Sequence, residues 1–286
     1  MRTDPIPLSH SGSGFSSAAT VSGLVKIYPT ATGETHALRG VDAEFHEHTV
    51  TALTGPSGSG KSTLLALLAL RDRPSGGDVA ILGRNASTLR ASERRAHSRQ
   101  AIAWVPQRAT DGIYPHLTAA QNVEQAARWR RAPADAGGGI LERLGLAQVT
   151  GLAASRLSGG EQQRVALACA CVGAPALILC DEPTAELDED TAALVMHELR
   201  TVAAGGSAVV IATHDPAAIA ASDRVVALRH GVMSTEQWGA TTARATIDPA
   251  GRVQLPPDAL GLFPNRRAVI RLDGDRVVLE PTEGES

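Results

Sequence analysis

The sequence is poor in aromatic residues and in lysine. Aromatic side chains make up 3% of its 286 residues, so Ala, Val and Leu must form most of the core that a hydrophobic content of 43% allows. Lys26 and Lys61 are the only lysines, so nearly all the positive charge is arginine. The formal net charge of −3 excludes a general electrostatic attraction to nucleic acid or to an anionic membrane surface.

Cysteines and long hydrophobic runs are also scarce. The three cysteines, Cys169, Cys171 and Cys180, lie in apolar stretches, which predicts buried, reduced thiols in a reducing cytoplasm; a C-x-C metal site would lack further ligands. The apolar run "LLALLAL" is seven residues long, far short of a bilayer span. The polar start "MRTDPIPLSHSGSGFSS" lacks the apolar region of a signal peptide, so we expect a soluble chain.

Short apolar strands alternate with amphipathic helices over residues 21–239. Such alternation predicts an α/β fold with a mostly parallel sheet covered by helices. The expected strands are "TVTALTG", "AIAWVPQ", "ALILCDE", "SAVVIATHD" and "DRVVAL". Residues 108–172 show helical patterns without a strand and are expected to form an inserted helical subdomain. Residues 1–20 are rich in Ser, Gly and Pro and are expected to be disordered.

A glycine-rich motif follows the first expected strand. It matches the P-loop pattern G-x-x-x-x-G-K-[ST], and a helix is expected directly after it. In such a loop backbone N–H groups surround phosphates, Lys61 reaches the β- and γ-phosphate oxygens, and the Ser62 hydroxyl binds Mg²⁺. The nucleotide-binding residues predicted here are Gly55, Pro56, Ser57, Gly58, Ser59, Gly60, Lys61, Ser62 and Thr63.

Two adjacent acids end another expected strand, "ALILCDEPT". Asp181 fits the carboxylate that a P-loop site needs near Mg²⁺. Glu182 lies one residue further out, where it can act as the general base on the attacking water. By themselves two acids at a strand end indicate a solvated turn, and only the P-loop favours the functional interpretation.

The stretch "RLSGGEQQR" predicts a helix start. Ser158 and Glu161 form an S-x-x-E capping box. Gly159 and Gly160 in the first turn weaken the helix but leave backbone N–H groups bare, an arrangement that suits an anion.

These motifs resemble those of ABC-type ATPases over residues 20–240, and "LSGGEQQR" matches the family signature without deviation. The resemblance implies further roles for single residues. Gln107 in "WVPQ" would sense Mg²⁺ and the γ-phosphate, Asp188 would belong to the D-loop, His214 would be the switch histidine, and Tyr28 would stack on adenine.

The resemblance also implies a P-loop fold, ATP and Mg²⁺ as cofactors, and a head-to-tail dimer. In that dimer Ser158, Gly159 and Gly160 would bind the γ-phosphate of ATP held by the other subunit. One motif set makes a homodimer the simplest assembly, with a heterodimer as the alternative.

A separate transmembrane permease would contact the surface formed by residues 108–126, holding the chain in the cytoplasm at the inner face of the cell membrane. Residues 117–123 are similar to the subgroup serving lipoprotein-releasing, macrolide-export and cell-division complexes.

Residues 240–286 predict a small β-rich module in which Asp273-Gly274 marks a hairpin turn. The module resembles the AbrB-type swapped-hairpin fold, which implies an intertwined dimer and in many cases DNA binding. Six arginines there are offset by seven acids, so a DNA site lacks its main electrostatic term. Three roles of the module stay open: dimerisation or regulation, DNA binding, or a β-module without a pairing role.

A second function class is a soluble ABC ATPase that acts on nucleic acid or ribosomes through this module. Such proteins usually carry two cassettes, long coiled coils or zinc-binding cysteine clusters, and this sequence has none of them. The arginines of "RNASTLRASERRAHSR" are expected to form a solvated helix face rather than a nucleic-acid site.

Overall fold

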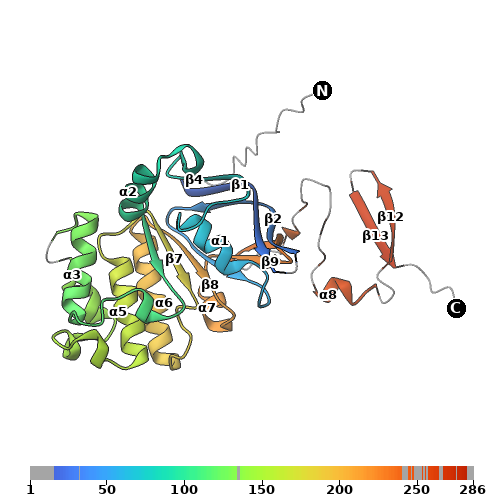
Figure 1. Cartoon of the computed structure of the whole chain (residues 1–286). Coiled ribbons are helices and arrows are strands. Elements are labelled where there is room, and N and C mark those ends of the chain that lie inside the picture. Colours follow the sequence, from blue (N-terminus) through green and yellow to red (C-terminus); the bar gives the residue numbers. More distant parts are fainter. Residues whose placement is uncertain are drawn as a thin grey trace.

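The computed structural model describes residues 16–31, 33–133, 136–239, 244–245, 247, 253, 255, 257–263, 267–274 and 276–281. Its strands form three sheets (Figure 1). The strands are β1 (Ser17–Thr30), β2 (Gly33–His46), β3 (Val50–Thr54), β4 (Gly76–Ile81), β5 (Arg84–Asn85), β6 (Ile102–Val105), β7 (Leu177–Asp181), β8 (Ala208–Ala212), β9 (Arg224–Arg229), β10 (Val232–Trp238), β11 (Arg244–Ala245), β12 (Ala268–Asp273) and β13 (Arg276–Pro281). The α-helices are α1 (Lys61–Leu68), α2 (Ala91–Ala101), α3 (Ala119–Arg130), α4 (Gly138–Arg143), α5 (Gly159–Cys171), α6 (Glu189–Ala204), α7 (Pro216–Ala220) and α8 (Pro257–Leu260).

The largest sheet has the strand order β11-β10-β9-β3-β8-β7-β6. Its members β9, β3, β8, β7 and β6 pair in parallel, and these are the five strands that the sequence predicts. Because parallel strands end at the same edge, Thr54, Val105, Asp181 and Ala212 bring four loops together there.

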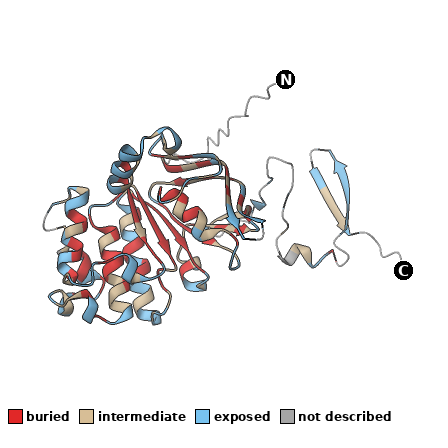
Figure 2. Ribbon diagram, in the orientation of Figure 1, coloured by how far each residue is buried: buried red, intermediate tan, exposed pale blue. Residues whose placement is uncertain are grey.

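Strand β7 shows how the core separates two layers of helices. All five of its residues are buried (Figure 2). Successive side chains of a strand point to opposite faces of the sheet. Leu177 and Leu179 belong to the hydrophobic cluster that contains the α1 leucines. Ile178 and Cys180 belong to the other cluster, which contains residues of α3, α5 and α6. The sheet therefore stands between α1 and α5.

The cysteines are free and packed against this core, as predicted. Cys171 and Cys180 are buried and Cys169 is half-buried. Burial raises the pKa of Cys169 to about 12 and that of Cys171 further, so both thiols stay protonated at neutral pH.

A second sheet, with the order β2-β1-β4-β5, is antiparallel and was not predicted. Its residues alternate in burial rather than forming apolar runs, as Leu38, Val41, Ala43 and Phe45 of β2 show. Strand β1 begins at Ser17, so the boundary expected at residue 20 falls inside a paired strand; residues 1–15 lie outside the described part.

Between β6 and β7 the described residues form helices and turns, with one isolated bridge between Thr118 and Ala153. The helical insert is expected over residues 108–172, within this region. At the other expected boundary, residue 239, pairing of the large sheet continues, because β11 pairs with β10. Beyond it β12 and β13 form the predicted hairpin, and Gly274 at its turn has φ of 60°. Most of "GRVQLP" lies outside the described residues.

Candidate active site

The loop between β3 and α1 requires glycine at two positions. Gly55 and Gly60 have φ of 141° and 106°, in the region that side chains disfavour. A Cβ on Gly55 would lie 2.1 Å from the carbonyl oxygen of Leu228, and one on Gly60 would lie 2.6 Å from that of Ala37. The loop is thus packed tightly against β9 and β2. Gly58, with φ of 75°, has open space around it at the exposed tip beside Pro56 and Ser57.

The start of α1 fits an anion. Gly60 provides no side chain to cap the helix, so the first N–H groups of α1 have no side-chain cap. Lys61 Nζ folds back over the loop and donates to the carbonyl oxygens of Gly55 (2.7 Å) and Pro56 (3.2 Å). The buried Ser59 hydroxyl has no partner among the described residues. This donor-rich loop fits the phosphates predicted for it.

Asp181 is the last residue of β7, beside this loop, and Glu182 follows it. Burial raises the pKa of Asp181, and a hydrogen bond from Ser62 opposes that shift. This contact brings together the hydroxyl and the carboxylate that the sequence predicts near Mg²⁺. Together they form an oxygen donor set of the kind that Mg²⁺ prefers.

Glu182 has a strained backbone. Its φ is 52°, a left-handed conformation that costs a non-glycine residue about 1–2 kcal/mol. Its N–H donates to the carbonyl oxygen of Ala212 at 2.8 Å, which holds the strained turn against β8. Strain of this kind is typical of functional sites.

His214 lies against the carboxylate of Glu182. Its Nδ1 is 2.9 and 3.0 Å from the two carboxylate oxygens, and its side chain is 81% exposed. The hydrogen bond with Glu182, and then its charge, raises the pKa of His214. The ion pair is therefore complete below the ordinary histidine pKa of about 6.5 and is lost as pH rises through the raised value.

The remaining predicted residues come from other elements. Gln107 is exposed and follows β6 at the same sheet edge. Asp188 caps α6 and accepts the N–H of Thr191 at 2.9 Å. The Tyr28 hydroxyl, on β1, donates to Asp72, a residue that the sequence patterns did not point to because the two are 44 positions apart.

The signature residues occupy a different place. Ser158 caps α5, and the predicted capping box is present: the Ser158 N–H donates to Glu161 at 2.8 Å, and the Glu161 N–H approaches Ser158 Oγ at 3.4 Å. Ser158 and Gly159 are exposed. The helix that they begin, α5, packs on the opposite face of β7 from α1, the helix that follows the P-loop.

Comparison with known proteins identifies the family. Residues 38–185, just over half of the chain, match the protein-family model described as "ABC transporter". The chain belongs to the ABC transporter family. It is 39% identical over 196 residues to the lipoprotein-releasing system ATP-binding protein LolD 2 of Caulobacter vibrioides, a match that covers 67% of this chain and 85% of the relative.

Two further ABC proteins are similar to this chain. Macrolide export ATP-binding/permease protein MacB 1/2 of Paracoccus denitrificans is 40% identical over 195 residues. The match covers only 29% of that relative, so this chain spans less than a third of its length. A dimeric structure of the ATP-binding cassette MJ0796, in a post-hydrolysis state bound to ADP and Pi, matches with a TM-score of 0.73, 30% identity and coverage of 78% of this chain and 100% of the other.

Proposed function

We propose that this ABC transporter family member binds Mg²⁺ and ATP at the P-loop, hydrolyses ATP, and drives a membrane complex formed with a separate permease subunit. The observation that carries the proposal is the grouping of Lys61, Ser62, Asp181, Glu182 and His214 at one sheet edge. In this proposal these residues serve as phosphate ligand, metal ligands, general base and partner of the base. The likeness to a cassette bound to ADP and Pi supports the assignment.

Each residue at this edge has a distinct task in the proposed reaction. Lys61 and the P-loop N–H groups hold the phosphates, while Ser62, Asp181 and Gln107 would hold Mg²⁺, which when bound neutralises phosphate charge. Glu182 accepts a proton from the attacking water. His214, in contact with both Glu182 oxygens, orients that carboxylate.

The signature helix supplies an anion site for a second chain. Ser158, Gly159 and Gly160 are exposed or half-buried on α5, on the far side of β7 from α1. A head-to-tail dimer lets them contact ATP held by the partner, with Asp188 at the same interface. The dimeric form of a similar cassette supports this arrangement, and one motif set per chain favours two identical copies.

A groove beside the helical insert is the proposed contact for the permease. It has a volume of about 210 Å³ and is lined by Trp104, Tyr114 and Trp129, three of the eight aromatic residues of the chain. Gly112, Tyr114, Asn122, Gln125 and Ala126 of its lining lie in the surface expected to receive a permease. Tyr114 and Trp129 are 40% and 50% exposed. Large exposed aromatic side chains of this kind are typical of protein–protein contact sites.

The membrane would be reached through that partner, at the inner face of the cell membrane. No helix of the described residues is long and apolar enough to cross a bilayer. The relatives above carry names of lipoprotein release and macrolide export, and none is named for work on nucleic acid. They favour the transport function over a soluble nucleic-acid ATPase.

A pull-down from detergent-solubilised membranes of the source organism tests the proposal. Tagged Glu182→Gln protein with ATP is expected to retain a polytopic membrane protein. The matched control carries Trp129→Ala and Tyr114→Ala in the same background and is expected to lose it. Recovery of nucleic acid without a membrane protein would contradict the transport function.

We also propose that the hairpin β12–β13 pairs two copies of the chain. Its register places Ile270 opposite Leu279 and Leu272 opposite Val277, so that one face is apolar, while Arg271 and Glu280 pair on the other. Ile270, Leu272 and Val277 are 69%, 77% and 66% exposed. Strand β12 is exposed along its length (Figure 2). A two-stranded hairpin is marginally stable alone. Two identical apolar faces, in a family with dimeric cassettes, cover each other.

Leu272→Asp is expected to convert the ATP-free dimer to monomer, because it places a charge in the apolar contact. Val278→Asp, on the opposite face of the hairpin and directly across from Arg271, is the control and should leave the dimer intact. Truncation after Gly239 is expected to give a monomer without ATP, as Leu272→Asp does. The measurement is molar mass by light scattering; an ATP-free mass that is the same in all four proteins contradicts the pairing role.

A further inference from the structure

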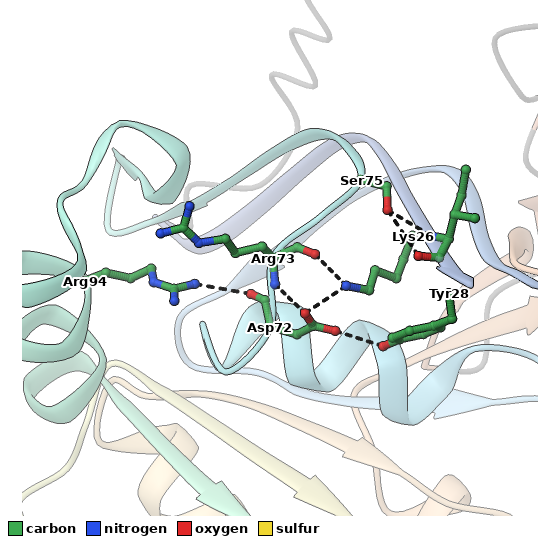
Figure 3. A network of polar contacts seen from close by, with 7 residues as sticks. Lys26, Tyr28, Asp72, Arg73, Ser75 and Arg94 are labelled. Atoms are coloured by element: carbon green, nitrogen blue, oxygen red, sulfur yellow. Dashed lines mark hydrogen bonds and ion pairs between the residues drawn. The ribbon is translucent and has the colours of Figure 1, made fainter. Parts of the chain in front are cut away.

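Tyr28 belongs to a polar cluster that joins β1 to the segment after α1 (Figure 3). We call Lys26, Tyr28 and Asp72 the Asp72 cluster. Lys26 Nζ donates to Asp72 Oδ1 at 2.8 Å, and the Tyr28 hydroxyl donates to Asp72 Oδ2 at 2.9 Å. Both carboxylate oxygens are thus engaged by side chains of one strand, two residues apart.

The carboxylate is held firmly in place. The Arg73 N–H also donates to Asp72 Oδ1, at 2.7 Å, and Lys26 Nζ also donates to the Arg73 carbonyl oxygen, at 2.8 Å. Ser75 Oγ accepts the N–H of Ile27 at 3.0 Å, which ties the same segment to β1 (Figure 3). Burial would raise the pKa of Asp72, but the hydrogen bonds from Lys26, Arg73 and Tyr28 lower it. The group stays ionised at neutral pH.

Lys26 is unusual because it is one of two lysines and is only 9% exposed. Besides its bonds to Asp72 and Arg73, its Nζ lies 4.7 Å from the centroid of the Tyr28 ring. This cation–π contact occupies one face of the ring. A base stacked on Tyr28 must therefore use the opposite face.

The ring also connects to the P-loop. Tyr28 is 36% exposed, and its hydroxyl interacts with Thr63 as well as with Asp72. Rotation of the Tyr28 ring is limited by its main chain in β1, by the hydroxyl contacts and by the Lys26 ammonium. An aromatic side chain ordered before binding loses less conformational entropy when a flat ligand stacks on it.

We propose that Asp72 is a positioning residue for the nucleotide base: with Lys26, it holds the Tyr28 ring in the orientation that stacks on adenine. The proposal rests on the ATP-binding function proposed above and on the stacking of adenine on Tyr28 that the family resemblance implies. Asp72 itself touches no nucleotide and acts through the Tyr28 hydroxyl. Asp72 follows α1 in the chain, and the P-loop residues precede and begin the same helix.

The test compares two ligands that differ in the base. Dissociation constants for AMP-PNP and for inorganic tripolyphosphate, both with Mg²⁺, are measured by calorimetry on the full chain. Asp72→Asn is expected to weaken AMP-PNP binding by about 3- to 10-fold and to leave tripolyphosphate binding unchanged. Asp78→Asn, an exposed aspartate of β4 that accepts bonds from Asn85 and Ser87, is the matched control.

Two further variants separate positioning from folding. Tyr28→Phe keeps the ring but removes the bond to Asp72, and it should weaken AMP-PNP binding as Asp72→Asn does. Adding Asp72→Asn to Tyr28→Phe should then have no further effect. If Asp72→Asn does not fold, the dissociation constants of Tyr28→Phe for the two ligands test the positioning role by themselves.

Equal losses for both ligands, or no loss in either variant, would overturn the positioning role. Failure of the underlying function gives a different pattern. A wild-type chain that binds neither ligand has no P-loop function, and a Tyr28→Ala chain that binds AMP-PNP as tightly as wild type has no stacking at Tyr28.

Discussion

Glu182→Gln is expected to lower kcat for ATP hydrolysis by about 10²–10⁴-fold, the usual contribution of a general base. The amide has nearly the shape of the carboxylate but cannot accept a proton from water. The bond from the residue 182 N–H to Ala212 is made by the main chain and survives the substitution. ATP binding should persist, so an ATP-bound dimer should accumulate. Phosphate release by the full chain measures the first effect. Molar mass with ATP measures the second, on the chain truncated after Gly239, which lacks the hairpin contact.

Glu186→Gln is the matched control. Glu186 lies in the same loop and also has a left-handed backbone, with φ of 64°, and it is exposed. His214 contacts Glu182, so the same substitution at Glu186 leaves the base and its partner intact. It should hydrolyse ATP at close to the wild-type rate. Normal turnover by Glu182→Gln, or equal losses in both variants, would show that Glu182 is not the base.

Arg143→Ala is expected to lower the free energy of unfolding by about 3 kcal/mol. Arg143 Nε and Nη2 donate to the two carboxylate oxygens of Glu198 at 2.6 and 2.8 Å. The Glu198 side chain is 1% exposed, so losing its partner leaves a buried charge without compensation. Because Arg143 itself is 46% exposed, water reaches part of the pair, and the loss lies at the low end of the usual range. Urea unfolding measures it.

A surface pair provides the comparison. Arg128 Nη2 donates to Glu124 at 2.7 Å one turn away on α3, and both side chains are exposed. Arg128→Ala should change stability by no more than about 0.5 kcal/mol. Replacing Arg143 and Glu198 together by leucine should recover most of the loss, since no buried charge is left. Similar losses in the free energy of unfolding for Arg143→Ala and Arg128→Ala would show that the burial of Glu198 does not make its ion pair more important than a surface pair.

The pair also joins two parts of the cassette. Arg143 lies on α4 between β6 and β7, and Glu198 lies on α6, which begins directly after Asp188. The bond therefore fixes α4 to the helix that extends from the proposed dimer interface.

The features that the sequence predicted well depend on residues that are close together in the chain. The capping box at Ser158 and the turn at Gly274 depend on a few neighbouring residues, and the structure has both. Apolar runs such as that of β7 predict buried parallel strands because both faces are covered. Strands β1 and β2 were missed because each is long, bulged and buried in alternation.

The sequence by itself determined the family, the parallel strands, the P-loop and the chemical types of the site residues. Only the tertiary structure decided which of them meet. His214 contacts Glu182 from 32 positions away, Asp72 contacts Tyr28 from 44, and Glu198 contacts Arg143 from 55. It also placed α5 and α1 on opposite faces of β7. Such contacts depend on strand order and register, which are set by packing across the whole core and not by the residues beside each motif.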